Sequence, residues 1–132
     1  MTKIDHIGIA TNSITEAMPF WEVLGFTSNG GGVVEEQGVV VRYLENESES
    51  RIELLEPITK DSPVGRFIEK RGVGIQQLAI SVDDIESTIY KLQKIGVKMI
   101  NYEPQIGHGG RKVAFIHPSS SGGVLVELVE SN

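Results

Sequence analysis

The chain contains no cysteine. This absence excludes a disulfide framework, a thiolate metal site and a thiol nucleophile, and a reducing cytoplasm is the expected compartment. Long apolar runs are missing as well, because no stretch approaches the ~20 residues that a membrane-spanning helix needs. The 132 residues suit a single domain with a core of its own.

Positive charge is also scarce: 12 Lys and Arg residues stand against 18 Asp and Glu residues, for a net charge of −6. Binding to nucleic acid or to anionic lipid requires a dominant positive field. The composition therefore predicts no nucleic-acid partner and no membrane partner. It leaves room for an anionic small molecule, since a local group of basic residues is enough to hold one.

An internal repeat is the strongest feature of the sequence. Residues 4–26 match residues 75–97 in pattern without a gap, at an offset of 71 residues. Each copy has a strand pattern followed by apolar residues at the helical spacing i, i+3, i+4, i+7. Candidate helix starts are Asn12, Ser13, Asp83 and Asp84, and candidate helix ends are Gly25 and Gly96.

Three strands are predicted after each helix. They are residues 26–34, 38–44 and 51–57 in the first copy, and 97–100, 112–118 and 123–130 in the second. The glycine run at 29–32 is read as a turn, because it lacks the context of a phosphate loop. A solenoid repeat is typically ~20 to 50 residues long, so this longer period predicts two βαβββ modules that form one curved mixed sheet around a cleft. The expected α+β domain has module one at about 1–60, a linker helix at about 62–72 and module two at about 74–132.

The first strand of each copy places a polar residue among small ones. Side chains alternate along a strand, so two groups each share one face: His6, Gly8 and Ala10, and Gln77, Ala79 and Ser81. The opposite faces are aliphatic and suited to packing under the helices. A face that is small beyond its polar residue is typical of a cleft lining.

The last strand of each copy carries a glutamate between aliphatic residues, Glu53 and Glu127. A buried carboxylate without a partner is costly, and a divalent cation removes that cost. Two carboxylates, a neutral imidazole and a neutral amide would leave such a site uncharged. We therefore expect His6, Glu53, Gln77 and Glu127 to bind a metal ion. The alternative is that each of these side chains simply finds a hydrogen bond or faces solvent.

Six stretches carry a resemblance to a known family: IDHIGIA, VLGF, IELLEP, SPVGRFIEKRG, EPQIGHGGRKVAFIHP and GGVLVELVE. They span nearly all of residues 3–130. On these stretches the chain resembles the vicinal oxygen chelate (glyoxalase-fold) superfamily and, within it, the methylmalonyl-CoA epimerase family. The long block that begins at residue 103 is the most specific of them for the epimerases.

The resemblance implies metal ligands at His6, Glu53, Gln77 and Glu127. The family usually has two histidines where this chain has Gln76 and Gln77, so one ligand departs from the pattern. An amide oxygen in place of an imidazole nitrogen favours harder ions. Co²⁺ or Mn²⁺ is therefore the favoured cofactor, with Zn²⁺, Ni²⁺ or Mg²⁺ as alternatives.

The resemblance also implies a reaction, the metal-dependent epimerisation of methylmalonyl-CoA at C2 through an enolate. Glu127 is the first choice for the catalytic base and Glu53 the second, because a ligand carboxylate can exchange between metal and proton. Some family members use a glutamate on the third strand, where this chain has Val41.

The loop at residues 107–112 is expected to border the cleft and to meet the anionic groups of coenzyme A. Its glycines permit a close backbone approach, and its basic residues offer charge. The expected substrate-binding residues are Gly109, Gly110, Arg111 and Lys112. A solvated hairpin turn is the alternative, and His108 in this loop is a further catalytic candidate.

Two other functions remain open at this point. One is a lactoylglutathione lyase-type isomerase, and the other is a metal-free small-molecule binding or resistance protein on the same fold. Gln77 keeps the second alternative open, since it weakens the metal-ligand set. A homodimer is expected from the resemblance alone.

Overall fold

The computed structural model describes residues 2–107 and 109–132 of the chain, so His108 lies outside the described residues. The chain divides into two compact units. The first unit consists of residues 6–76. The second unit consists of residues 77–132 together with the N-terminal residues up to Asp5.

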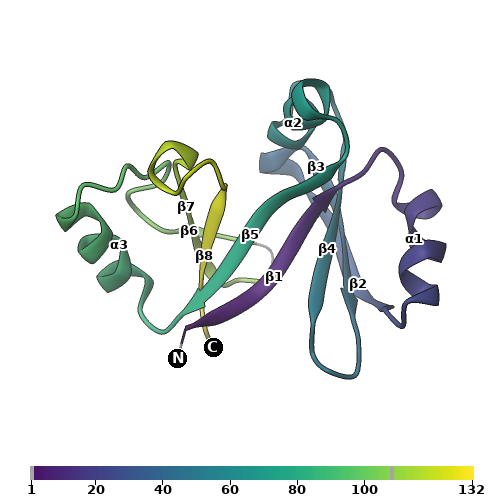
Figure 1. The fold of residues 1–132 in the computed structure, drawn as a ribbon, viewed down its shortest axis with the longest axis horizontal. Helices are drawn as coiled ribbons and strands as arrows, with labels where there is room; N and C mark the ends of the chain where they lie inside the picture. Colours follow the sequence, from purple (N-terminus) through teal and green to yellow (C-terminus); the bar gives the residue numbers. More distant parts are fainter. Residues whose placement is uncertain (1, 108) are drawn as a thin grey trace. The chain divides into compact units, whose positions relative to one another are not determined.

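The strands and helices follow the order that the repeat predicts (Figure 1). The first half of the chain contains β1 (Lys3–Ala10), α1 (Ile14–Val23), β2 (Thr27–Val34), β3 (Val39–Glu45), β4 (Arg51–Pro57) and the linker helix α2 (Pro63–Arg71). The second half contains β5 (Gly74–Val82), α3 (Ile85–Lys94), β6 (Gln105–Ile106), β7 (Lys112–Ile116) and β8 (Val126–Glu130).

The pairing of the strands is the same in both units. In the first unit the order is β2-β3-β4-β1, and in the second it is β5-β8-β7-β6. In each unit the first and last strands pair in parallel, β1 with β4 and β5 with β8, while the other neighbours are antiparallel. None of the helices in the described part of the chain has both the length and the apolar character that a membrane crossing requires.

Local hydrogen bonds explain where α1 and α3 begin. The Ser13 hydroxyl accepts the backbone N–H of Glu16 at 3.2 Å, and the Asp84 carboxylate accepts that of Ser87 at 3.0 Å. Each bond satisfies a backbone donor that has no partner within its helix. These two caps are among the helix starts that the sequence predicts.

A second carboxylate ties each helix start to the last strand of its own unit. Glu56 Oε1 accepts the backbone N–H of Ile14 at 2.7 Å, and Glu130 Oε2 accepts that of Ile85 at 3.1 Å. These two glutamates lie three residues after the predicted ligands Glu53 and Glu127 of the same strands. A negative charge at a helix N-terminus is favourable because the helix dipole is positive there.

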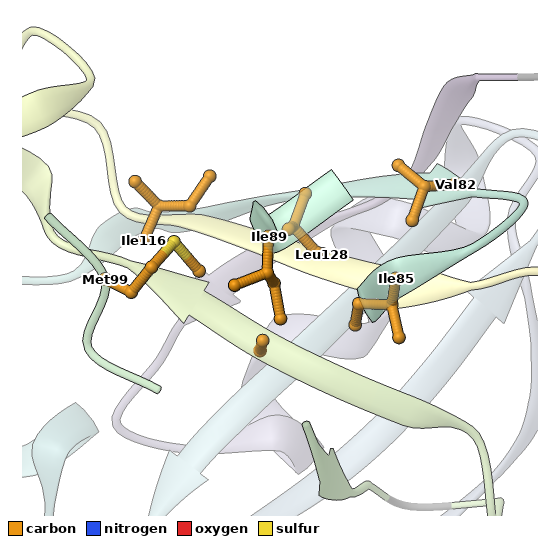
Figure 2. Packing of buried hydrophobic residues seen from close by; sticks show 7 residues of the cluster. Val82, Ile85, Ile89, Met99, Ile116 and Leu128 are labelled. Carbon is orange, nitrogen blue, oxygen red and sulfur yellow. The ribbon is translucent and has the colours of Figure 1, made fainter. Parts of the chain in front are cut away.

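Apolar side chains under the helices form the cores of the two units. In the second unit, Ile85 and Ile89 of α3 pack against Leu128 of β8, and Val82 and Met99 close the cluster (Figure 2). In the first unit, α1 packs on Leu44 and Leu54, both fully buried. The opposite face of that sheet packs against α2 in a cluster of Ala10, Val39, Val41, Leu55 and Val64.

Two local predictions were wrong. The glycine run is not a turn but part of β2, with a register shift between Ser28 and Gly31. A Cβ on Gly31 would lie 2.1 Å from the Val41 carbonyl oxygen, so only glycine permits this approach of β2 to β3.

The other error concerns the strand predicted at residues 97–100. That segment makes only an isolated bridge from Met99 to Ile116, and β6 lies later, at residues 105–106. Its backbone is held instead by single bonds, such as that from the His117 N–H to the Lys98 carbonyl and that from the Lys98 N–H to the Ser120 hydroxyl. The Ile100 N–H also bonds the Phe115 carbonyl at 2.8 Å, so the segment lies beside β7 but forms no strand of its own.

Candidate active site

The first half-site is a pair of side chains from β1 and β4. The two strands run parallel with Gly8 opposite Glu53, which places His6 two residues before that position. His6 Nε2 lies 3.0 Å from Glu53 Oε2. Their side chains are only 9% and 15% exposed, so the pair is largely withdrawn from water.

The second half-site repeats this geometry on β5 and β8. Ala79 lies opposite Glu127, and Gln77 again precedes that position by two residues. Gln77 Nε2 donates a hydrogen bond of 3.0 Å to Glu127 Oε1. Both residues are 8% exposed.

The four predicted ligands thus come together as two pairs, each on the parallel strands of its own unit. The register of each pair is the same, and in both the polar side chain contacts a glutamate carboxylate. The match follows from the parallel register and from the alternation of side chains. In each unit the polar residue lies two positions before the residue opposite the glutamate, so both side chains lie on the same face of the sheet. Whether all four bind one ion stays a prediction.

Small and aliphatic residues complete the same face in both units, as the alternation predicted. In the first unit, Ala10 packs with Val41 and Leu55. In the second, the cluster is Ala79, Val113 and Val129. Val41 is only 3% exposed, so the position at which some family members have a glutamate is here a core residue.

An aromatic residue lies directly across from each glutamate, and the sequence alone did not reveal it. Tyr43 of β3 is opposite Glu53, and Phe115 of β7 is opposite Glu127. Directly opposed residues of antiparallel strands share a face with their Cβ atoms ~4.5 to 5.5 Å apart. Both aromatic residues lie within strands that the sequence predicts, but which residue faces which glutamate follows only from the strand register.

The donor atoms of the first half-site fit a divalent ion. Two neighbouring ligands of an octahedral ion with bonds of ~2.1 Å lie about 3.0 Å apart, which is the spacing of His6 Nε2 and Glu53 Oε2. Gln77 turns its Nε2 toward Glu127, so ligation requires the amide to rotate and present its oxygen. Among the described residues no group of three His, Cys, Asp or Glu side chains forms a metal site, and Gln77 as an amide falls outside that set.

The basic residues of the predicted substrate loop already have partners within the second unit. Arg111 donates through Nε to the Glu130 carbonyl at 3.0 Å and through Nη2 to Asp5 Oδ1 at 3.1 Å. Lys112 Nζ lies 2.8 Å from Glu86 Oε1, and this hydrogen bond raises the pKa of the lysine ammonium. The Asp5 side chain is 6% exposed, so Arg111 serves to neutralise a buried carboxylate.

The two glycines of this loop, Gly109 and Gly110, are exposed and have positive φ angles of +86° and +80°. Other side chains rarely adopt such angles, which accounts for glycine at both positions. Of the two cations among the predicted substrate-binding residues, Lys112 is the more exposed, at 44% against 20% for Arg111.

The first unit also contains a pocket of about 410 Å³. None of the predicted ligands lines it. The lining residues are Asn12, Pro57, Ile58, Thr59, Lys60, Gly65, Ile68 and Glu69.

Comparison with known proteins gives consistent matches over the whole chain. A family model described as the Glyoxalase/Bleomycin resistance protein/Dioxygenase superfamily matches residues 5–115. An uncharacterized protein of Bacillus subtilis is 42% identical over 131 residues, which cover 98% of this chain and 93% of that protein.

Two further matches have an assigned activity. The mitochondrial methylmalonyl-CoA epimerase of Homo sapiens is 33% identical over 131 residues, which cover 98% of this chain and 74% of that protein. A solved structure of a Streptomyces coelicolor methylmalonyl-CoA epimerase variant, in complex with 2-nitronate-propionyl-CoA, aligns with a TM-score of 0.91 and 35% identity. That alignment covers 99% of this chain and 95% of the other.

Proposed function

The chain belongs to the Glyoxalase/Bleomycin resistance protein/Dioxygenase superfamily and, within it, to the methylmalonyl-CoA epimerase family, and from this premise we propose that it epimerises methylmalonyl-CoA at C2. The glyoxalase fold predicted from the sequence is confirmed by this membership. The prediction of an isomerase is confirmed at the level of the family. The substrate and the residues that act on it are the content of the proposal.

The observation that carries the proposal is the pair of buried, repeat-equivalent half-sites. Each combines a carboxylate with a nitrogen-bearing side chain at the same register position. An epimerase must remove the C2 proton on one face of the substrate and return it on the other. Two equivalent carboxylates suit this requirement, because each can accept or donate a proton.

Complexes of relatives support the substrate class. One solved epimerase structure holds methylmalonyl-CoA, with 35% sequence identity to this chain, and another holds 2-nitronate-propionyl-CoA. A nitronate is a planar anion and therefore has the shape and charge of an enolate. The same class of ligand is proposed for this chain.

His6, Glu53, Gln77 and Glu127 are the residues that would hold a divalent ion, with Co²⁺ or Mn²⁺ favoured. When bound, such an ion acts as a Lewis acid that polarises carbonyl oxygens and stabilises negative charge on them. The two carboxylates balance its charge, while the imidazole and the amide add none. Without an ion, the His6 imidazole and the Gln77 amide each contact the carboxylate of their half-site at 3.0 Å.

Glu127 is proposed as the base that removes the C2 proton. Glu127 is only 8% exposed, so it is largely withdrawn from water. The Gln77 amide lies beside this carboxylate, with Nε2 3.0 Å from Oε1. Glu53 is proposed as the second acid–base group, and a positioned group of this kind contributes typically ~10² to 10⁴-fold to the rate.

Lys112 and the backbone of Gly109 and Gly110 are proposed to meet the anionic part of coenzyme A. Lys112 is 44% exposed in its side chain, and a substrate phosphate would compete with Glu86 for its ammonium group. Arg111 is the less available cation, because it is committed to Asp5. A homodimer in the cytoplasm is the state in which we expect the protein to act.

Deuterium uptake tests the proposal. The protein is incubated in D₂O with methylmalonyl-CoA and with Co²⁺, Mn²⁺, Zn²⁺, Ni²⁺ or Mg²⁺ in turn, and C2 exchange is followed by mass spectrometry. We expect exchange well above the protein-free rate with at least one ion, and its loss in Glu127→Gln. Exchange at the protein-free rate with every ion would contradict the proposal.

A metal-free binding protein is the second candidate, and one observation favours it. The Gln77–Glu127 hydrogen bond partners the carboxylate without an ion. Metal analysis of protein purified without chelators separates the candidates, since the epimerase is expected to retain or rebind about one ion per chain. Turnover of the methylglyoxal–glutathione hemithioacetal, measured alongside, would instead identify a lactoylglutathione lyase-type isomerase.

A further inference from the structure

Glu127 lies between two apolar side chains in the second half-site. Ala79 of β5 is opposite Glu127 on one side, and Phe115 of β7 is opposite it on the other. Directly opposed residues share a face of the sheet, and in an antiparallel pair their Cβ atoms are ~4.5 to 5.5 Å apart. The proposed base therefore has a methyl group on one side and a phenyl ring on the other.

The Phe115 ring is not part of the core of its unit. One apolar cluster of the second unit lies under α3 and the other around Ala79, and Phe115 belongs to neither. Phe115 is half-buried, and in the part of the chain that the structure describes it pairs with no other ring. In the first unit, by contrast, Tyr43 packs against a buried cluster. Phe115 thus presents apolar surface beside Glu127 that the core does not use.

The backbone that carries this ring is held from both sides. The Phe115 N–H donates to Asn101 Oδ1 at 2.9 Å, and the Phe115 carbonyl accepts the N–H groups of Ile100 at 2.8 Å and of Asn101 at 3.3 Å. The other neighbour of β7 is β8, which carries Glu127. A side chain on a supported strand shapes a binding site more precisely than one on a loop, so Phe115 is suited to a role in specificity.

The chemistry of the proposed reaction brings the substrate to this ring. A base that removes a proton from C2 has its oxygen within about 3.5 Å of that carbon. The alkyl group on C2 is one carbon–carbon bond away, ~1.5 Å, so it lies near the side chains that flank Glu127. Ala79 is 0% exposed. Phe115 is therefore the flanking residue that the alkyl group can contact.

We propose that the Phe115 ring forms an apolar wall against the C2 alkyl group of the acyl thioester and limits the size of that group. This inference rests on the proposed function. A phenyl ring suits this role because an alkyl group makes no hydrogen bonds and gains from contact that removes its surface from water. Phe115 thus determines specificity for methylmalonyl-CoA over thioesters with a longer C2 substituent.

The test compares wild type, Phe115→Leu and Phe115→Trp with methylmalonyl-CoA and ethylmalonyl-CoA, which differ by one methylene group. Deuterium exchange at C2 gives kcat/KM for each thioester, and calorimetry gives each binding affinity. We expect Phe115→Leu to raise the ratio of ethylmalonyl-CoA to methylmalonyl-CoA activity roughly tenfold or more, the scale of one methylene in an apolar pocket. The larger ring of Phe115→Trp should lower the same ratio.

Phe26→Leu is the matched control. Phe26 is also half-buried, but its ring packs against the core cluster under α1 and against Trp21. This variant should leave the activity ratio unchanged. Because each ratio is taken within one variant, a general loss of stability or of active protein cancels, and thermal unfolding measures that loss separately.

Binding and exchange together separate the two proposals. A ratio that stays at the wild-type value in both Phe115 variants, or that changes as much in Phe26→Leu, would overturn the role of Phe115. Wild type that binds methylmalonyl-CoA without exchanging its C2 proton would overturn the proposed function, while the ratio of binding affinities still decides the role of Phe115. Wild type that binds neither thioester would overturn both.

Discussion

The two units of this chain have kept the same backbone register around their site residues while changing the chemistry at that register. His6–Glu53 and Gln77–Glu127 lie at equivalent steps of parallel strand pairs, and both contacts measure 3.0 Å. Imidazole in one unit has its counterpart in an amide, and a phenol has its counterpart in a phenyl ring. The two units therefore share the positions of these residues but differ in their functional groups.

The same lesson holds away from the site. Glu56 and Glu130 bind the starts of α1 and α3 in the same manner, and Ile14 and Ile85 are the first residues of those helices. Both isoleucines are buried. The helix starts are thus alike in the two units, whereas the nitrogen-bearing side chains of the two half-sites differ.

The largest expected effect comes from replacing the carboxylates of the two half-sites one at a time, which tests whether the two units contribute equally to catalysis. Glu127→Gln is expected to lower the rate of C2 exchange by about 10² to 10⁴-fold, because it removes the proposed base while keeping the shape of the side chain. Glu53→Gln should cost less, and circular dichroism serves to check that both variants fold. A larger loss in Glu53→Gln would reverse the assignment of the first base.

Truncation of the equivalent core residues tests whether the units contribute equally to stability. Ile14→Ala and Ile85→Ala should each lower the free energy of unfolding by about 2 to 5 kcal/mol, through lost burial and the cavity that remains. The effect at Ile85 should be the larger, since Ile85 is 0% exposed and Ile14 is 5% exposed. Urea unfolding measures both, and indistinguishable changes would argue against burial as the source of the difference.

Replacing Gln77 by histidine gives both half-sites an imidazole, so the variant tests how the amide affects the choice of metal ion. Gln77→His is expected to shift the preference from Mn²⁺ toward Zn²⁺ by roughly tenfold or more, since imidazole nitrogen suits Zn²⁺ better than amide oxygen does. Competition with a chromophoric chelator measures the two affinities without reference to turnover. Gln76→His, on the opposite face of β5, is the matched control, and an equal shift in that variant would show that Gln77 is not a ligand.

The smallest expected difference is at the helix starts. Glu56→Gln and Glu130→Gln should each lower the free energy of unfolding by about 0.5 to 1 kcal/mol, because the neutral amide loses the favourable interaction with the helix N-terminus. The shorter bond at Glu56, 2.7 Å against 3.1 Å, predicts the greater loss there. Thermal unfolding of the two variants at low salt provides the comparison, and a greater loss at Glu130 would contradict it.

Much of the fold could be predicted from residue patterns, because most elements occur once in each copy of the repeat. The helix starts at Ser13 and Asp84, the strand faces of His6 and Gln77 and the linker helix were all predicted from local chemistry. The prediction failed at residues 29–32 and 97–100, where local composition competes with pairing. The glycines enter β2 because β3 approaches closely. Residues 97–100 keep a few backbone bonds to residues 115–117, but the Lys98 N–H bonds the Ser120 hydroxyl instead of a strand carbonyl.

The sequence by itself determined the duplicated module, the helix caps and the four candidate ligands, since periodicity and side-chain chemistry are properties of the chain alone. Only the tertiary structure decided which side chains meet. It paired His6 with Glu53 and Gln77 with Glu127, committed Arg111 to Asp5, and set Tyr43 across from Glu53. These outcomes depend on strand register, which arises from contacts between residues far apart in the chain and cannot be read from local pattern.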